Sequence, residues 1–329
     1  MKRILLLLVG VLVVGVAAGW PASAQQRETP RDLPAPPRLS VQEWGVWILE
    51  GGRVTVEELA AESPPFVVRA QAALRPPDGA RPTPNPPSPR PPVIVRPDVT
   101  VRKPVVFFHA SEPLDVTVDV RFRGGRPWLL YPSASEAQGN RLLWRGRVGG
   151  PGTPPAVDEG HWWNDLRAVG ADGFETDRGG YERFVFYDGQ VRFAPLFRFQ
   201  RVGGAPEPSI APQRGAEGPL FVVQRGRVVV HDVNDGRWFE AHRGAAASVL
   251  PRVGAALRAR GLSDAETRAL LDVWRDELLS PRPHAIYFVP RAAYDRMLPM
   301  RLDARTPSGV AAEVDLVRVG LVIERLSES

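Results

Sequence analysis

The strongest constraint on the fold is a succession of short strand-forming runs between Val93 and Glu240. Each run is rich in valine, phenylalanine, tyrosine, tryptophan or leucine, and glycine, asparagine or aspartate stands at the joints. In Leu114–Phe122 apolar and polar residues alternate, which is typical of an antiparallel strand with one buried face. Many short strands joined by tight turns predict antiparallel, sandwich-like sheets.

The strands predicted in this region are Pro104–His109, Leu114–Phe122, Trp128–Tyr131, Arg141–Val148, Tyr181–Tyr187, Val191–Arg198, Leu220–Gln224 and Arg227–Val230. The turns predicted between them are Gly124-Gly125, Asp188-Gly189, Arg225-Gly226 and Asn234-Asp235-Gly236. Asp232–Gly236 also has the oxygen-rich composition of a calcium loop, but it lacks the terminal glutamate of such a loop. The hairpin turn is therefore the preferred interpretation, and no metal site is predicted.

After Ala241 the pattern changes from strands to helices. Ser248–Arg260 has a helical composition and is followed by Gly261, a residue that commonly terminates helices. Ser263 and Glu266 have the spacing of a capping box, which predicts the start of a second helix.

The remainder of the chain predicts a mixed structure. A short helix is expected at Arg291–Met297, and strands are expected at Ala285–Val289, Met300–Asp303 and Val314–Ile323. This tail is either a small α+β domain or a helical pair packed on the same sheets. The predicted fold class is therefore mainly β, with antiparallel sandwich-like sheets and a C-terminal α+β unit that contains a helical pair.

Composition divides the chain into six predicted segments. In the third, Val41–Glu50 and Arg53–Glu57 are predicted to pair through a turn at Gly51-Gly52. In the fourth, nine of 18 residues are proline, which favours an extended polyproline II linker. The segments are a signal peptide at 1–24, a tether at 25–40, an N-terminal strand pair at 41–74, the proline-rich linker at 75–92, a β domain at 93–240 and the α+β unit at 241–329.

The first residues predict export. A basic start at Lys2 and Arg3 precedes the apolar run Ile4–Ala18, and Ala22-Ser23-Ala24 is a signal-peptidase pattern. The apolar run is shorter than the roughly 20 residues that span a bilayer, so cleavage after Ala24 is expected, with no stable transmembrane segment afterwards. The expected location is periplasmic or extracellular. Because the chain has no cysteine, its fold depends on the core without disulfides.

The charge pattern and the motifs exclude several function classes. The net charge is +5, and the arginines alternate with acidic residues instead of forming the basic face of a nucleic-acid-binding protein. Lys103 is the only lysine after residue 24. The sequence contains no zinc-protease, nucleophile-elbow or phosphate-loop motif, and no cofactor is predicted.

Six short motifs occur in order along the chain: Lys103–His109, Tyr131-Pro132, Leu143–Gly146, Phe186–Gly189, Leu271–Glu277 and Tyr287–Arg291. Together they resemble an uncharacterised family of exported bacterial proteins. That family has a block similar to Lys-Pro-Val-Ile-Tyr-Leu-Tyr-Pro, followed by an alternating strand, a Tyr-Pro pair and an aromatic-Trp-x-Gly hairpin. The resemblance implies a shared fold and an exported location. It implies no activity, and His109-Ala110 replaces the family's Tyr-Pro.

The densest polar and aromatic cluster is Asp158–Asp165, after a Gly/Pro-rich loop. Asp158, Glu159, His161 and Asp165 are candidates for acid–base catalysis, because glycoside hydrolysis uses two carboxyl groups near one bond. Trp162 and Trp163 are candidates for stacking on sugar rings. The structural alternative is preferred: one tryptophan fills the core, the other covers an edge, and Asn164 or Asp165 caps a helix reaching Val169.

These observations favour an exported, non-catalytic envelope or surface protein whose partner is a protein or a glycan. One alternative is a hydrolase that acts on cell-wall or extracellular polysaccharide through the Asp158–Asp165 cluster. Another is a structural module of a surface-assembly or secretion system, with Val41–Glu57 as a detachable strand pair.

Overall fold

The computed structural model describes residues 35–49, 55–70, 98–200, 208–234 and 237–326. The chain divides into two units between Ala35 and Pro36, and every strand and helix described belongs to the second, Pro36–Ser329. The predicted signal peptide, the proline-rich linker, the Gly51-Gly52 turn and residues 235–236 lie outside the described residues.

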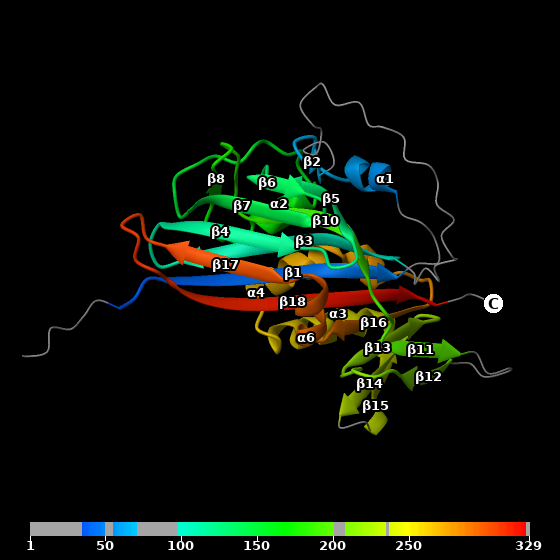
Figure 1. Cartoon of the computed structure of the whole chain (residues 1–329). Helices are drawn as coiled ribbons and strands as arrows, with labels where there is room; N and C mark the ends of the chain where they lie inside the picture. The colour runs from blue at the N-terminus through cyan, green and yellow to red at the C-terminus, as the bar shows by residue number, and fades with distance from the viewer. Residues whose placement is uncertain (1–34, 50–54, 71–97, 201–207, 235–236, 327–329) are drawn as a thin grey trace, which may run out of the picture. The chain divides into compact units, whose positions relative to one another are not determined.

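A ten-stranded sheet runs through the middle of the second unit (Figure 1). Its neighbours are antiparallel except for the first and last strands of the chain, which pair in parallel. In spatial order the strands are β15 (Arg237–Ala245), β14 (Arg227–Asn234), β13 (Leu220–Gln224), β16 (His284–Val289), β18 (Glu313–Arg325), β1 (Arg38–Leu49), β3 (Asp98–Ala110), β10 (Val185–Arg192), β5 (Arg126–Tyr131) and β2 (Val68–Arg69).

A second sheet covers one face of the first. Its strands are β17 (Met300–Arg305), β4 (Leu114–Arg121), β7 (Arg141–Val148), β8 (Phe174–Thr176) and β9 (Tyr181–Glu182), with β6 (Glu136–Gln138) beside β7. Val116, Trp144 and Phe174 from this sheet pack in one buried cluster with Phe108 and Tyr187 of the large sheet. A separate hairpin consists of β11 (Phe197–Gln200) and β12 (Ser209–Pro212). The alternating pattern of Leu114–Phe122 thus buries its apolar side between two sheets, and the predicted mainly β, sandwich-like class is confirmed.

Helices cover the other face of the large sheet. Val253 and Leu270 from the helical pair pack in a second buried cluster with Trp44, Phe107 and Phe288 from the strands. The helices on this face are α1 (Val56–Ala61), α2 (Trp163–Arg167), the 3-10 turn η2 (Ala246–Ser248), α3 (Val249–Arg258), α4 (Asp264–Val273) and α5 (Arg275–Leu278). Helix α6 (Arg291–Met297) lies on the opposite face, where Tyr294 packs in the same buried cluster as the second sheet. The predicted C-terminal pair is α3 and α4, and the capping box forms as expected, since Ser263 Oγ accepts from Glu266 N at 3.2 Å.

The C-terminal strands join the main sheets. β16 and β18 lie between β13 and β1 in the ten-stranded sheet, and β17 pairs with β4 in the second sheet. Of the two arrangements left open by the sequence, the structure contains a helical pair packed on the same sheets.

The predicted N-terminal strand pair is wrong. β1 starts at Arg38, inside the predicted tether, and lies between β18 and β3 in the sheet interior. The described part of the predicted partner strand, Thr55–Glu57, instead forms the N-cap and the start of helix α1. Thr55 and Glu58 form a capping box, in which Thr55 Oγ1 accepts from Glu58 N at 3.2 Å and Glu58 Oε2 accepts from Thr55 N at 2.8 Å. At these residues the N-terminal helix signal outweighs the local alternation.

A second correction concerns Asp188-Gly189, which was predicted as a turn. Both residues lie inside β10, where the pairing with β3 shifts register between Phe186 and Gly189. A Cβ atom on Gly189 would lie 2.3 Å from the Phe122 ring, so glycine is required here by close packing and not by a reversal of the chain.

Most other predicted strands are present, and two are divided. Tyr181–Tyr187 is split into β9 and β10, and Val191–Arg198 is split into β10 and β11 on either side of Pro195. Arg225 and Gly226 both have positive φ, 50° and 72°, as expected for a tight two-residue hairpin between β13 and β14.

Candidate functional site

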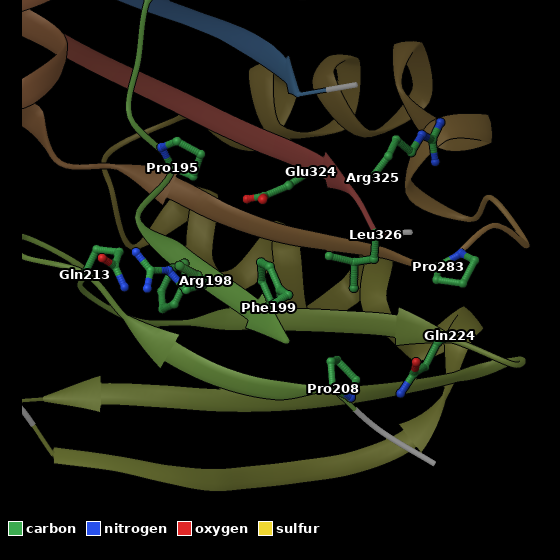
Figure 2. A pocket seen from close by; sticks show the side chains of 11 residues that line it. Pro195, Arg198, Phe199, Pro208, Gln213, Gln224, Pro283, Glu324, Arg325 and Leu326 are labelled. Carbon is green, nitrogen blue, oxygen red and sulfur yellow. The ribbon is translucent and has the colours of Figure 1, made fainter. Parts of the chain in front are cut away.

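The candidate site is a cavity of about 570 Å³ beside the β11–β12 hairpin, named here the Glu324 cavity. Its walls combine flat apolar side chains with hydrogen-bonding ones, and its volume lies in the usual range for small-ligand pockets. The lining residues are Pro195, Phe197, Arg198, Phe199, Pro208, Gln213, Gln224, Pro283, Glu324, Arg325 and Leu326. Figure 2 shows the Glu324 carboxyl extending from β18 into the space between that strand and the hairpin.

Glu324 has an unusual setting for an acidic side chain. Tyr287 on β16 donates its hydroxyl to Glu324 Oε2 at 2.7 Å, and the Phe197 ring lies 5.0 Å from the Tyr287 ring, edge to face. Burial raises the pKa of Glu324 to about 7, against the opposing hydrogen bond from Tyr287. The carboxyl therefore changes charge near neutral pH, and it offers a donor when protonated and only acceptors when ionised.

The two arginines of the lining differ in their roles. Arg325 points away from the cavity in Figure 2 and forms an ion pair with Glu277 of α5. Arg198 on β11 is exposed at the rim. The acidic group of the described lining is thus Glu324 alone, and a positive charge stands at the opening.

A second hollow of about 580 Å³ lies on the outer face of the smaller sheet. Its charged side chains neutralise one another: Arg147 contacts Asp115 at 2.9 Å, and Arg305 contacts Asp303 at 3.2 Å. The described lining contains no aromatic side chain. Paired surface charges and a lack of apolar platforms make it the weaker candidate.

The sequence-predicted cluster Asp158–Asp165 lies elsewhere, on a loop and on α2. Trp163 is completely buried, and its Nε1 donates to Glu182 Oε2 at 2.8 Å. Arg167 contacts the same carboxylate at 2.6 Å. Trp163 therefore fills the core beneath α2, as the structural interpretation predicted, and presents no face to a ligand.

Trp162 and His161 cover an edge of the protein. Trp162 Nε1 donates to the carbonyl of Glu62 at 2.9 Å, and the His161 ring lies 5.3 Å from the Trp162 ring. His161 Nδ1 accepts from the backbone N–H of Trp163 at 3.1 Å. Burial and the neighbouring Lys103 charge lower the pKa of His161. The histidine is oriented by the backbone and not by a carboxylate.

The three acidic candidates of this cluster are exposed. Asp158 contributes its backbone carbonyl to Asn164 Nδ2 at 2.9 Å, and α2 has no side-chain cap, so the expected cap by Asn164 or Asp165 does not form. Partial burial and Asp272 raise the pKa of Asp165. None of Asp158, Glu159 and Asp165 lines the Glu324 cavity.

Two groups in unusual environments had no role in the sequence-based prediction. Glu324 lies one residue beyond the predicted strand Val314–Ile323, and its environment depends on Tyr287, 37 residues away. The sequence alone could have singled out Lys103, because it is the only lysine after residue 24 and precedes a proline inside a strand-forming run. In the structure its amine lies 4.3 Å from the centre of the Trp162 ring.

The chain matches no protein-family model, no curated protein and no solved structure. Within the described ranges, no group of three or more histidine and acidic side chains is arranged to hold a metal ion. In the same part of the chain, no helix combines the length and apolar character needed to cross a bilayer.

Proposed function

We propose that this protein is an exported, non-catalytic binding protein of the cell envelope and that it holds a glycan segment in the Glu324 cavity. The observation that carries the proposal is the chemistry of the lining. Phe199 provides a partly exposed aromatic ring beside the buried Phe197, and Gln213, Gln224 and Glu324 provide donors and acceptors. A sugar has a matching combination of apolar ring faces and a rim of hydroxyl groups.

The same lining argues against glycoside hydrolysis in this cavity. Most glycosidases place two carboxyl groups on either side of the scissile bond, whereas the described lining contributes Glu324 alone. The tyrosine hydrogen bond at 2.7 Å positions that single carboxyl as a hydrogen-bonding group. Binding without turnover is the function that this set supports best.

Export is supported by the basic start, the apolar run and the Ala22-Ser23-Ala24 pattern, and it remains part of the proposal. The surface-assembly alternative has less support. It requires Val41–Glu57 to detach as a strand pair, yet β1 is hydrogen-bonded to both β3 and β18.

The test is co-sedimentation of the purified protein with cell-wall sacculi and with a panel of insoluble polysaccharides, with soluble sugar measured in the supernatant. We expect binding without sugar release. Phe199→Ala and Glu324→Gln should each weaken binding about tenfold, the loss expected from removing an apolar platform or a hydrogen-bonding charge. No binding to any glycan would overturn the proposal and would favour a protein partner.

Glu159→Gln is the matched control for Glu324→Gln. It makes the same chemical change on an exposed side chain outside the cavity, so binding should be unaltered. The same variant tests the hydrolase alternative together with Asp165→Asn. Release of sugar by the unmodified protein, abolished by these two changes, would move the function to the Asp158–Asp165 cluster.

A further inference from the structure

Lys103 lies at an interruption of the large sheet. β1 pairs Trp44 with Val105 and then Val46 with Arg102, so the strand β3 bulges at Lys103 and Pro104. Lys103 has a φ of 51°, a left-handed conformation that is unfavourable for a residue with a side chain. Bulges of this kind redirect a side chain, and strained backbone positions are concentrated at functional sites.

Asp188 holds this conformation in place. Its carboxylate accepts the hydrogen bond from the Lys103 backbone N–H, which the bulge removes from the strand ladder. Asp188 is only 2% exposed, and burial raises its pKa to about 6, against the opposing hydrogen bond from Lys103. A buried carboxylate thus fixes the backbone that aims the lysine.

The Lys103 amine is enclosed by two tryptophans. Nζ lies 4.3 Å from the centre of the Trp162 ring and 4.9 Å from that of Trp274, and the side chain is 12% exposed. Glu62 Oε2 lies 3.9 Å from Nζ, while Glu62 is also paired with Arg102. Of these two tryptophans, Trp162 was itself a sequence candidate for ligand binding.

Burial and the adjacent Arg102 guanidinium lower the pKa of Lys103 to about 8, against the opposing effects of Glu62, Asp188 and Glu277. Removal of a lysine from water and a neighbouring cation are the two conditions that activate lysine as a nucleophile toward carbonyl groups. Both conditions are present here.

We infer that Lys103 is a reactive amine that condenses with the aldehyde group of a small hydroxyaldehyde or an open-chain sugar. The bulged backbone of β3, the faces of Trp162 and Trp274 and the Glu62 carboxylate surround this amine. The neutral amine attacks the carbonyl carbon, and a C–N bond forms as one amine hydrogen passes to the carbonyl oxygen. The C–O bond then breaks, and the oxygen leaves as water with both amine hydrogens, which gives the imine. Glu62 is placed to relay these protons.

The experiment incubates the purified protein with glycolaldehyde at a series of pH values, reduces any imine with borohydride and locates adducts by peptide mass mapping. Arg301→Lys, on the exposed face of β17, supplies an internal comparison lysine. We expect an adduct on Lys103 whose yield is half-maximal near pH 8. At pH 7.5 it should form about tenfold faster than the adduct on the introduced lysine, because a larger fraction of Lys103 is neutral at that pH. The lower nucleophilicity of an amine with a lower pKa offsets part of this advantage.

Lys103→Arg should remove this adduct without changing the labelling of the N-terminal amine. An unmodified Lys103 beside a labelled comparison lysine, or equal rates for the two, would overturn the inference. These readings come from the unmodified protein and from a surface variant, so they do not depend on the folding of Lys103→Arg. They also do not involve the Glu324 cavity, so the glycan-binding proposal and this inference can fail separately.

Discussion

Glu43 and Glu324 place the same side chain in two different environments within one sheet. Glu43 on β1 is completely buried, and Glu324 on β18 faces a cavity. Each accepts a hydrogen bond from a tyrosine hydroxyl, Tyr187 in the first case and Tyr287 in the second. Both tyrosines belong to the same hydrophobic cluster.

The difference is the guanidinium of Arg318. Arg318 is itself buried, with a side chain 1% exposed, and it forms an ion pair with Glu43. It also contacts Asp295 at 2.8 Å and donates to the carbonyl of Leu298 at 2.7 Å. Glu324 has the tyrosine, but no ion pair with Glu324 is found among the described residues, and burial raises its pKa to about 7.

The comparison teaches that burial alone does not determine what a carboxylate does. A buried acid that is paired with a cation acts as part of the core, because its charge is compensated within the protein. A buried acid without a paired cation can still form hydrogen bonds or an ion pair with a ligand. This is the physical reason for placing the site at Glu324.

The largest expected effect comes from breaking the ion pair between Arg318 and Glu43. Arg318→Met should reduce the free energy of unfolding by about 3–5 kcal/mol, since it leaves Glu43 as an uncompensated buried charge. Urea unfolding measures this. Arg301→Met, on an exposed position of β17, is the matched control and should stay within about 0.5 kcal/mol of the unmodified protein.

The double variant Glu43→Gln with Arg318→Met should recover part of this loss, because the remaining neutral amide needs no counter-charge. A loss below about 1 kcal/mol for Arg318→Met alone would contradict the structural role of the pair.

The second prediction concerns the uncompensated acid. Because the folded pKa of Glu324 is raised to about 7 from an ordinary 4.5, folding binds a proton between these values. Its contribution therefore makes the protein less stable as the pH rises from about 5 to about 8, by about 2–3 kcal/mol. Glu324→Gln should remove this loss while keeping an acceptor for Tyr287.

Unfolding curves for Glu324→Gln and the unmodified protein at pH 5 and pH 8 isolate this contribution. We expect the difference in unfolding free energy to shift by about 2–3 kcal/mol in favour of the variant at the higher pH. A difference independent of pH would show that Glu324 titrates in its ordinary range.

The smallest expected effect comes from removing the hydroxyl groups of Tyr187 and Tyr287, which bind the two glutamates. Tyr187→Phe removes a hydrogen bond to a paired, fully buried carboxylate and should cost about 2 kcal/mol. Tyr287→Phe makes the same change beside the cavity, where solvent can replace the lost donor, and should cost about 1 kcal/mol. Both values come from urea unfolding at neutral pH, and equal losses would argue against the difference in environment.

Local chemistry determined the parts of the fold that the sequence predicted well. The Ser263–Glu266 capping box and the positive φ of Gly261, 97°, depend on residues a few positions apart. The alternation of Leu114–Phe122 likewise needs only the period of a strand. Where two local signals competed, as at Thr55–Glu58, the weaker alternation rule gave the wrong element.

The site required information that no short window contains. Glu324 acquires its raised pKa from the hairpin and strands around it, and Lys103 is redirected by Asp188 across 85 positions of the chain. The dipeptide Asp188-Gly189 reads locally as a turn, whereas its function in the structure is to fix a bulge. Contacts between side chains so far apart in the sequence can be predicted only when the order of the strands in the sheet is known.

The parallel pairing of β1 with β18 has a consequence for how the chain can mature. Arg38–Leu49 aligns with Glu313–Glu324 residue by residue, so the centre of the large sheet is built from segments at opposite ends of the sequence. Contacts between such distant segments form late, because the chain must first close a very long loop. A polypeptide that crosses a membrane N-terminus first would have to wait, with β1 lacking one neighbour, until almost all of it had emerged. For the exported protein that we propose, a holding chaperone on the far side of the membrane would protect this unpaired edge of β1 from aggregation during transit.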